Sequence, residues 1–336
     1  MKIIALEEHF VLPEFMDVWE DAADGHDEAD SVLVRTRRVQ QAALDLGDQR
    51  IAAMDDQGVN VQVLSLNSPG VQNLPAPDAV SMARHANDAL ADAVAAHPDR
   101  FQGFAAVPTP DPAAAAAELE RAVSTLGFPG ALINGRTGDL SMENRVFDDL
   151  YGVAERLGAP IYIHPQVPTA AVRDAYYSGL GDLDFVLSSP AIGWHYETGI
   201  QFLRMAIGGV FDRFPDLQVV LGHWGELVLF YHERWQPTLE QTGLHLQRPL
   251  SEVLRQNVWV TGSGILSERY FRWAAEVVGT DRIMTATDYP YIDNSGGAAR
   301  TFIENLPATE AKRTAIASGN WERLTARKTA PSTPNA

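Results

Sequence analysis

Eight short apolar segments, each followed by a stretch of helical periodicity, restrict this chain of 336 residues to very few folds. Most of these segments are apolar without strict alternation, as expected for parallel strands that are covered on both faces. The predicted strands are 2–9, 60–67, 101–107, 130–134, 160–164, 217–223, 257–262 and 282–288. Eight strands that alternate with helices predict an α/β fold, the (β/α)8 TIM barrel.

No linker or change of composition interrupts this alternation, so we expect a single barrel domain over residues 1–325. The tail, 326–336, is rich in Pro, Thr and Ala, and we expect it to be disordered. Two connections are longer than a barrel needs: 10–45, which is acidic and poor in helix signals, and 165–195. Both follow the carboxyl ends of predicted strands, where barrel enzymes carry their active sites, so we expect functional loops there.

Composition and charge exclude several classes of function. The formal net charge of −18 opposes a phosphate backbone, so we expect no nucleic-acid partner. No apolar run approaches the roughly 20 residues that span a bilayer, and the apolar start is too short for a signal peptide. We therefore expect a cytoplasmic protein with no membrane partner. The chain contains no Cys, which removes disulfides, Cys-zinc sites and thiol catalysis.

The first predicted strand ends in two acids and an imidazole, Glu7, Glu8 and His9. Side chains in a strand alternate between its faces, so Glu7 and His9 are expected on one side and Glu8 on the other. By itself this Glu-x-His pair favours a polar strand end that arose by chance over a metal or catalytic site, because short motifs often match by accident.

Three further predicted strands end in side chains that could join this pair. They are His164 on the fifth strand, His223 on the sixth with Glu226 three residues later, and Asp288 on the eighth. Either of these histidines alone could be a hydrogen-bonded core residue. The carboxyl ends of barrel strands meet at one face, however, so we expect a shared site. Two imidazoles with one or two carboxylates predict one divalent metal ion, Zn²⁺, with Mn²⁺ as the alternative.

The chain resembles the amidohydrolase superfamily, and within it the branch of ortho-hydroxybenzoate decarboxylases that includes the γ-resorcylate and 5-carboxyvanillate enzymes. The resemblance runs from residue 3 to about residue 325. It rests on ALEEHF, LSLNSPGVQ, HPDRFQGFAAVP, LGFPGALING, YIHP, GGVFDRFPDLQVVLGHWGE and TDYPY, in this order. Most hydrolytic members carry His-x-His on the first strand, whereas several of these decarboxylases carry Glu-x-His, as this chain does.

The resemblance implies roles for particular residues. The implied metal ligands are Glu7, His9, His164 and Asp288, with His223 and Glu226 positioning Asp288 and Arg234 contacting the substrate carboxylate. Asn67, Trp194 and His195 are further candidates for lining the substrate pocket. Each of these candidates also has a plainer interpretation. Arg234 could be a surface arginine on a helix, and Asn67 could be a turn asparagine. Trp194 and His195 could be residues that only pack a loop.

The implied activity is that of a carboxy-lyase, the metal-dependent and non-oxidative decarboxylation of an ortho-hydroxy aromatic acid. Asp288 would protonate the ring carbon that bears the carboxylate, and carbon dioxide would then leave. A metal-dependent hydrolase or hydratase on the same scaffold is the main alternative, and a barrel without catalytic activity is the other. The family also suggests a homodimer or homotetramer.

One departure from the family concerns the pocket. After the histidine of the fifth strand these decarboxylases often read HPRNP, whereas this chain reads HPQVP. Gln166 therefore stands where a basic side chain is frequent, and this leaves the ring substituents of the substrate open.

Overall fold

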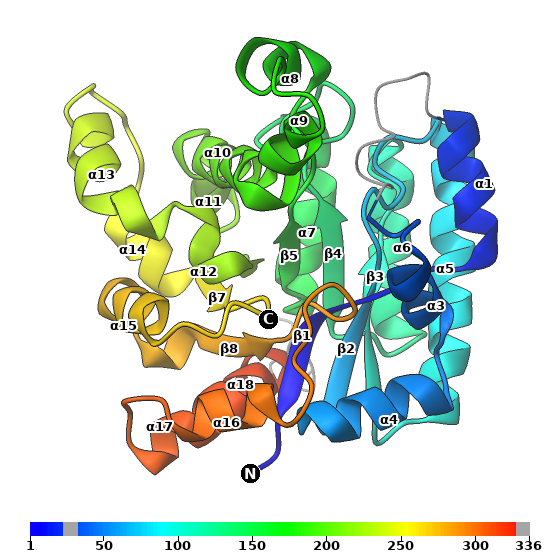
Figure 1. Ribbon diagram of the computed structural model, residues 1–336. Helices are drawn as coiled ribbons and strands as arrows, with labels where there is room; N and C mark the ends of the chain where they lie inside the picture. Colours follow the sequence, from blue (N-terminus) through cyan, green and yellow to red (C-terminus); the bar gives the residue numbers. More distant parts are fainter. Residues whose placement is uncertain (23–32, 327–336) are drawn as a thin grey trace, which may run out of the picture.

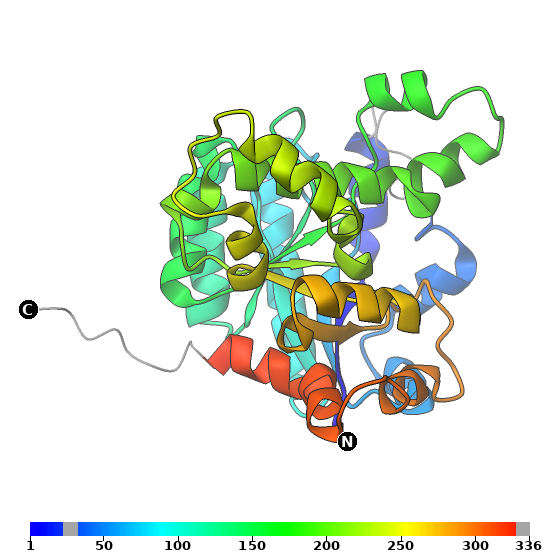
Figure 2. The same cartoon turned by 90° about the vertical axis from the view of Figure 1, so that its left-hand side faces the viewer.

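The computed structural model describes residues 1–22 and 33–326, and its eight parallel strands close into a barrel in chain order (Figures 1 and 2). This confirms the predicted (β/α)8 architecture. The first and last residue of every strand lie within two residues of the predicted ones. The strands are β1 (Ile4–Phe10), β2 (Val61–Leu66), β3 (Phe101–Ala106), β4 (Gly130–Asn134), β5 (Ile161–His164), β6 (Val219–Leu221), β7 (Val258–Thr261) and β8 (Ile283–Ala286).

Helices surround the barrel and also extend beyond the carboxyl ends of its strands (Figure 1). The α-helices are α1 (Pro13–Ala22), α3 (Arg37–Leu44), α4 (Asp48–Gln57), α5 (Ala76–Ala96), α6 (Pro112–Ser124), α7 (Asp148–Leu157), α8 (Ala170–Tyr176), α9 (Leu183–Val186), α10 (Gly193–Ile207), α11 (Val210–Arg213), α12 (His223–Glu226), α13 (His232–Glu240), α14 (Leu250–Gln256), α15 (Glu268–Val277), α16 (Ala298–Glu304), α17 (Glu310–Thr314) and α18 (Asn320–Ala326). Shorter helical turns are η1 (Arg145–Phe147), η2 (Leu187–Ala191), η3 (Leu229–Tyr231), η4 (Thr280–Arg282) and η5 (Ala315–Gly319).

Local signals in the sequence set several helix ends. At α6, the carboxylate of Asp111 accepts a hydrogen bond from the backbone N–H of Ala114 at 3.0 Å, and Pro112 occupies the first turn. This combination satisfies one of the free N–H groups of the first turn and fixes a helical φ. At α7, Gly158 ends the helix in the left-handed region, with φ of 60°.

The hydrophobic core has two layers, one inside the barrel and one between the strands and the helices. Along β5, Tyr162 packs inside the barrel while Ile161 and Ile163 pack against the helices. This alternation sends the next residue, His164, back toward the barrel axis at the carboxyl end of the strand. The barrel interior is thus apolar through its middle and polar at the end where the candidate site residues lie.

Both long connections contain more helix than the sequence indicates. The segment after β1, expected to be poor in helix, forms α1 and α3, because Pro13 suits a first helical turn and α1 buries Phe15 and Trp19. Most of its acidic stretch falls in 23–32, outside the described residues. The segment after β5 forms α8, α9 and η2 before α10 begins at Gly193.

At the carboxyl end, Ala326 was expected to be the first residue of the disordered tail, but it is the last residue of α18. The rest of the tail, 327–336, lies outside the described residues. Among the helices that the structure describes, none is both long enough and apolar enough to span a bilayer.

Candidate metal and active site

A bulge in β1 decides which of its polar side chains enter the barrel. Ile4 and Leu6 pack in the barrel interior, so regular alternation would send Glu8 inward and Glu7 outward. The register of β1 against β2 instead shifts between Ala5 and Glu8, and Glu7 adopts a φ of 61°. A left-handed residue other than Gly costs about 1–2 kcal/mol. The extra residue reverses the alternation and turns Glu7 inward.

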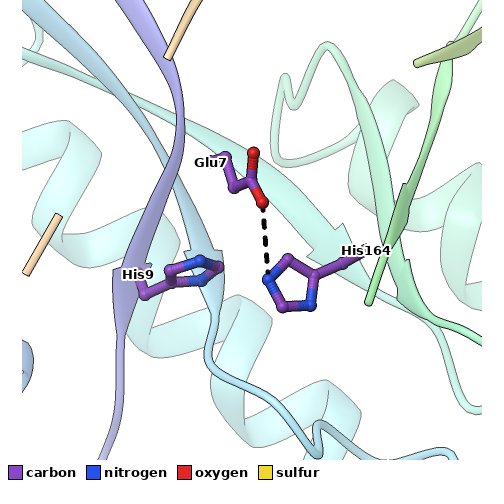
Figure 3. A group of neighbouring side chains, drawn as sticks. All are labelled: Glu7, His9 and His164. Carbon is purple, nitrogen blue, oxygen red and sulfur yellow. Dashed lines mark ion pairs between the residues drawn. The ribbon is translucent and has the colours of Figure 1, made fainter. Parts of the chain in front are cut away.

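Glu7, His9 and His164 converge inside the barrel mouth (Figure 3). One ligand atom from each lies within 4.8 Å of the others, and Glu7 Oε1 is 3.5 Å from His164 Nε2. Glu7 Oε1 and His9 Nε2 are both fully buried, and neither has a hydrogen-bond partner in the part of the chain that the structure describes. Buried polar atoms are normally partnered, so two such atoms that face one centre fit a bound cation.

The two histidines are oriented by contacts on their other ring nitrogens. His164 Nδ1 lies 2.8 Å from the carbonyl oxygen of Pro165, which fixes the proton on Nδ1 and leaves Nε2 free. His9 Nδ1 lies 3.3 Å from Ser65 Oγ. Burial lowers the pKa of His164 well below its usual range, and the neighbouring His9 adds to this effect. A neutral imidazole with a fixed tautomer is the form that binds a metal ion.

Glu7 is held through its second oxygen. The hydroxyls of Tyr162 and Ser263 donate to Glu7 Oε2, and Tyr162 also lies 2.7 Å from Thr261 Oγ1. Burial raises the pKa of Glu7, against the opposing effect of His223, so the ionised form requires a nearby positive charge. Sequence reasoning missed Tyr162 and Ser263. The alternation of β5 could have indicated Tyr162, because it precedes His164 by two residues.

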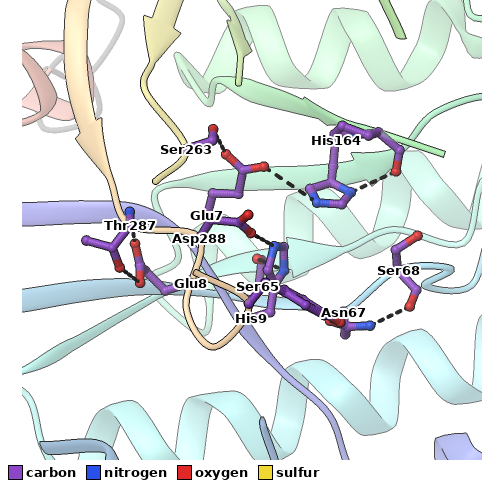
Figure 4. A network of polar contacts seen from close by, with 12 residues as sticks. Glu7, Glu8, His9, Ser65, Asn67, Ser68, His164, Ser263, Thr287 and Asp288 are labelled. Carbon is purple, nitrogen blue, oxygen red and sulfur yellow. Dashed lines mark hydrogen bonds and ion pairs between the residues drawn. The ribbon is translucent and has the colours of Figure 1, made fainter. Parts of the chain in front are cut away.

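Asp288 completes the arrangement from β8. Its Oδ1 lies 3.4 Å from His9 Nε2 (Figure 4). The preceding residue, Thr287, donates from its backbone N–H to Glu8 Oε1 at 2.7 Å and from its hydroxyl to Glu8 Oε2 at 2.6 Å. Glu8 also accepts from Gln62 Nε2 at 3.0 Å. The residue of the EEH motif that faces away from the site therefore ties the end of β8 to β1.

A second cluster lies beside the first. Glu226 accepts from His223 Nδ1 at 2.7 Å through one oxygen and from His195 Nδ1 at 2.8 Å through the other. His223 Nδ1 is also 3.9 Å from Glu7 Oε1, which links the two clusters. Within the described residues no hydrogen bond joins His223 or Glu226 to Asp288, so any control of Asp288 by this pair acts through space.

Electrostatics favour the ionised form of this pair. Burial opposes the charge of Glu226, but His223 and His195 lower the pKa of its carboxyl to about 2. Burial likewise opposes a charged His223, yet Glu226 and Glu7 raise its pKa to about 10. The pair is therefore an imidazolium and a carboxylate at neutral pH.

The pocket candidates are placed less uniformly. His195 and Trp194 lie in the first turn of α10, and Trp194 Nε1 donates to His195 Nε2 at 3.1 Å. Asn67 is buried, and its carboxamide donates to the carbonyl of Ser68 and accepts from the hydroxyl of Tyr291. Both the nitrogen and the oxygen of the amide are therefore engaged by loop residues. Arg234 lies on α13 with an exposed side chain, and no described hydrogen bond or ion pair connects that side chain to the site.

Strained backbone gathers at the same end of the barrel. Seven residues other than Gly have positive φ in the described chain, and all lie in β1 or after β6, β7 and β8: Glu7, His223, Trp224, Glu226, Leu227, Ser263 and Asp288. Such conformations cost free energy and cluster at functional sites.

The chain is similar to known proteins over almost its whole length. The amidohydrolase family model matches residues 9–324. A γ-resorcylate decarboxylase from Polaromonas sp. strain JS666 is 35% identical over 334 residues, which cover 96% of this chain and 97% of the relative.

Solved structures give the same result. The 5-carboxyvanillate decarboxylase from Sphingomonas paucimobilis matches with a TM-score of 0.89 and 33% identity over 97% of this chain and 99% of its own. The dihydroxybenzoic acid decarboxylase from Polaromonas sp. JS666, with bound manganese and the inhibitor 2-nitroresorcinol, matches with a TM-score of 0.84 and 33% identity over 98% of each chain. This chain belongs to the amidohydrolase family, in the branch that contains these decarboxylases.

Proposed function

We propose that this protein is a metal-dependent decarboxylase of an ortho-hydroxy aromatic carboxylic acid. The observation that carries the proposal is the buried convergence of Glu7, His9 and His164 beside Asp288, with two ligand atoms that lack a hydrogen-bond partner among the described residues. The relatives named above, which share this fold over almost their whole length, are decarboxylases of hydroxylated aromatic acids. This favours decarboxylation over the hydrolase or hydratase alternative.

Glu7, His9, His164 and Asp288 would hold the divalent ion. When bound, the ion supplies Lewis acidity and a template for the substrate's oxygen atoms. A mixed set of imidazole and carboxylate ligands suits both zinc and manganese. The Polaromonas structure was obtained with manganese, so we propose manganese as the first metal to test, and zinc as the second.

Asp288 is the proposed proton carrier. It would take the proton of the ortho-hydroxyl group and deliver it to the ring carbon that bears the carboxylate. The bond from that carbon to the carboxylate then breaks, carbon dioxide leaves, and the electron pair restores the aromatic ring. The imidazolium of His223, paired with Glu226, would stabilise the negative charge that remains on the substrate.

The pocket residues complete the proposal. Trp194 lies in the first turn of α10, at the end of the connection after β5, where an indole ring could flank an aromatic substrate. Asn67 accepts a hydrogen bond from the hydroxyl of Tyr291, whose ring centroid lies 5.7 Å from that of His9. Arg234 enters through the resemblance alone, as a guanidinium suited to a carboxylate. We also propose a cytoplasmic location and a homodimer or homotetramer, both of which enter through the resemblance and the composition alone.

The test is a panel assay with the manganese-loaded and the zinc-loaded protein. Ring absorbance and carbon dioxide release are followed for γ-resorcylate, 2,3-dihydroxybenzoate, salicylate and 5-carboxyvanillate. We expect metal-dependent release of carbon dioxide from at least one acid. If a protein with stoichiometric metal releases none from any of them, while it hydrolyses a lactone or hydrates an unsaturated keto acid, the proposal is wrong.

A further inference from the structure

Arg50, in α4, is a completely buried cation without a role so far. Its guanidinium donates four hydrogen bonds, all to uncharged acceptors: the backbone carbonyls of His9, Ala42 and Asp45 and the side-chain Oε1 of Gln62. Within the described chain no ion pair joins this guanidinium to a carboxylate. A buried charge is costly when no counter-ion is close, so the position calls for more than a link between α4 and the barrel.

Arg50 contacts the chain on both sides of the pair formed by His9 and Asp288. Its Nη2 donates to the carbonyl of His9 at 2.6 Å, and its guanidinium carbon lies 4.8 Å from the ring centroid of Tyr289. Tyr289 directly follows Asp288, and its carbonyl accepts from the backbone N–H of His9 at 2.7 Å. One side chain therefore holds the backbone of His9 and the neighbour of Asp288, whose side chains meet at 3.4 Å.

A further hydrogen bond extends the network to the residue on the other side of Asp288. Arg50 Nη1 donates to Gln62 Oε1 at 3.2 Å, and Gln62 Nε2 donates to Glu8 Oε2 at 3.0 Å. The cation and the carboxylate thus fix which way this buried amide points. Glu8 in turn accepts from the N–H and the hydroxyl of Thr287, which precedes Asp288 (Figure 4).

Asp288 itself has a backbone conformation that needs such support. Its φ is 56°, in the left-handed region that side chains other than Gly rarely adopt. A strained residue of this kind persists only where its surroundings fix it. Thr287 and Tyr289 are the fixed points before and after it, and the contacts of both lead back to Arg50.

We propose that Arg50 is a positioning residue that sets the separation between His9 and Asp288. Its Nη2 holds the carbonyl of His9 while the face of the guanidinium packs on Tyr289, so that both neighbouring ligand atoms are presented to one centre. Both contacts depend on the positive charge, because charged donors form the stronger hydrogen bonds and only a cation is attracted to the ring face. The inference rests on the proposed function, since it assumes that His9 and Asp288 hold the metal ion.

The experiment separates metal binding from turnover. Calorimetric titration of the metal-free protein with Mn²⁺ gives the affinity, and electron paramagnetic resonance of the bound Mn²⁺ reports its ligand arrangement. Carbon dioxide release gives kcat and KM. Arg50→Lys keeps the charge but not the planar fork, so we expect it to bind Mn²⁺ about tenfold more weakly with an altered spectrum. At saturating Mn²⁺ its kcat should fall by about tenfold while KM stays within about threefold.

A pair of variants at Tyr289 keeps the test decisive if Arg50→Lys does not fold. Tyr289→Leu removes the ring that the guanidinium contacts, so Mn²⁺ affinity and kcat should each fall by about threefold or more. Tyr289→Phe keeps the ring and should stay within about twofold of wild type in both measurements.

Arg282, directly before β8 at the opposite end of the barrel, supplies the matched control. Its guanidinium carbon lies 4.5 Å from the ring centroid of Trp259, and its Nη1 donates to Gln218 Oε1 at 3.0 Å, so it makes the same two kinds of contact. Arg282→Lys should lower the free energy of unfolding but leave Mn²⁺ affinity and kcat within about twofold of wild type. A purely structural Arg50 would behave in the same way.

The outcomes are distinct. Wild-type Mn²⁺ affinity and kcat in Arg50→Lys overturn the positioning role, even if that variant is less stable. Equal behaviour of the two Tyr289 variants, or an equal loss of Mn²⁺ affinity in Arg282→Lys, overturns it as well. If Mn²⁺ binding responds as expected but no acid releases carbon dioxide, the positioning role stands and the decarboxylase activity fails. A wild-type protein that binds neither Mn²⁺ nor Zn²⁺ overturns the metal centre on which both rest.

Discussion

Glu8 offers a direct test of how the active end of the barrel is held together. Its carboxylate accepts three hydrogen bonds, from the backbone N–H and the hydroxyl of Thr287 and from Gln62. In Glu8→Ala the hydroxyl can rotate, but the N–H groups of Thr287 and Gln62 remain buried without acceptors. A buried unsatisfied donor costs about 1–3 kcal/mol, so we expect the free energy of unfolding to fall by about 2–6 kcal/mol.

Glu8→Gln separates shape from hydrogen bonding. The carboxamide keeps the volume and one acceptor oxygen, so its loss should be about 1–2 kcal/mol. Urea unfolding at pH 7, followed by tryptophan fluorescence, gives these differences, and Glu14→Ala on the exposed surface of α1 should remain within about 0.5 kcal/mol of wild type.

Activity provides the second measurement, because Thr287 precedes Asp288. Loss of its anchor should lower kcat in Glu8→Ala by about tenfold or more, since small displacements of a reacting group are costly. An Ala variant that matches wild type in both unfolding free energy and kcat would refute the reasoning.

Three further predictions concern the site itself. Asp288→Asn should abolish carbon dioxide release while far-UV circular dichroism stays unchanged, and activity close to wild type would remove Asp288 as the proton carrier. Dialysis against a chelator should abolish turnover and added manganese should restore it, whereas full activity in protein verified as metal-free would exclude a metal role. Glu226→Gln should be less stable than wild type at pH 7. The low pKa of Glu226 contributes stability that is present above about pH 4.5 and lost as the pH falls toward about 2. Urea unfolding should therefore show the difference between the two proteins shrinking over that pH window.

The barrel could be predicted because its evidence is local. Each strand is a short apolar run bounded by turn residues, and each can be identified without knowledge of the others. The same holds for the polar residues at strand ends: Glu7, His9 and His164 lie together in the structure and Asp288 Oδ1 lies 3.4 Å from His9 Nε2, while their role as metal ligands stays a prediction. What the sequence predicts well is therefore which residues arrive at the mouth of the barrel.

The bulge at Glu7 is a feature that strand alternation does not predict. Alternation correctly predicted that Glu7 and His9 share a face, but a regular β1 would have turned both away from the barrel interior that Ile4 and Leu6 occupy. The left-handed conformation that corrects the alternation occurs at a glutamate, for which no local signal favours it. Tertiary contacts impose it, because the hydroxyls of Tyr162 and Ser263, far away in sequence, hold the carboxylate inside.

The contact between His195 and Glu226 could not be predicted for the same reason, and it has a consequence for charge. Trp194 Nε1 donates to His195 Nε2 at 3.1 Å, and His195 Nδ1 donates to Glu226 Oε2 at 2.8 Å. His195 thus contacts one oxygen of Glu226 while His223 contacts the other. The connection after β5, which the sequence indicated only as a loop near the pocket, therefore fixes the carboxylate that keeps His223 charged.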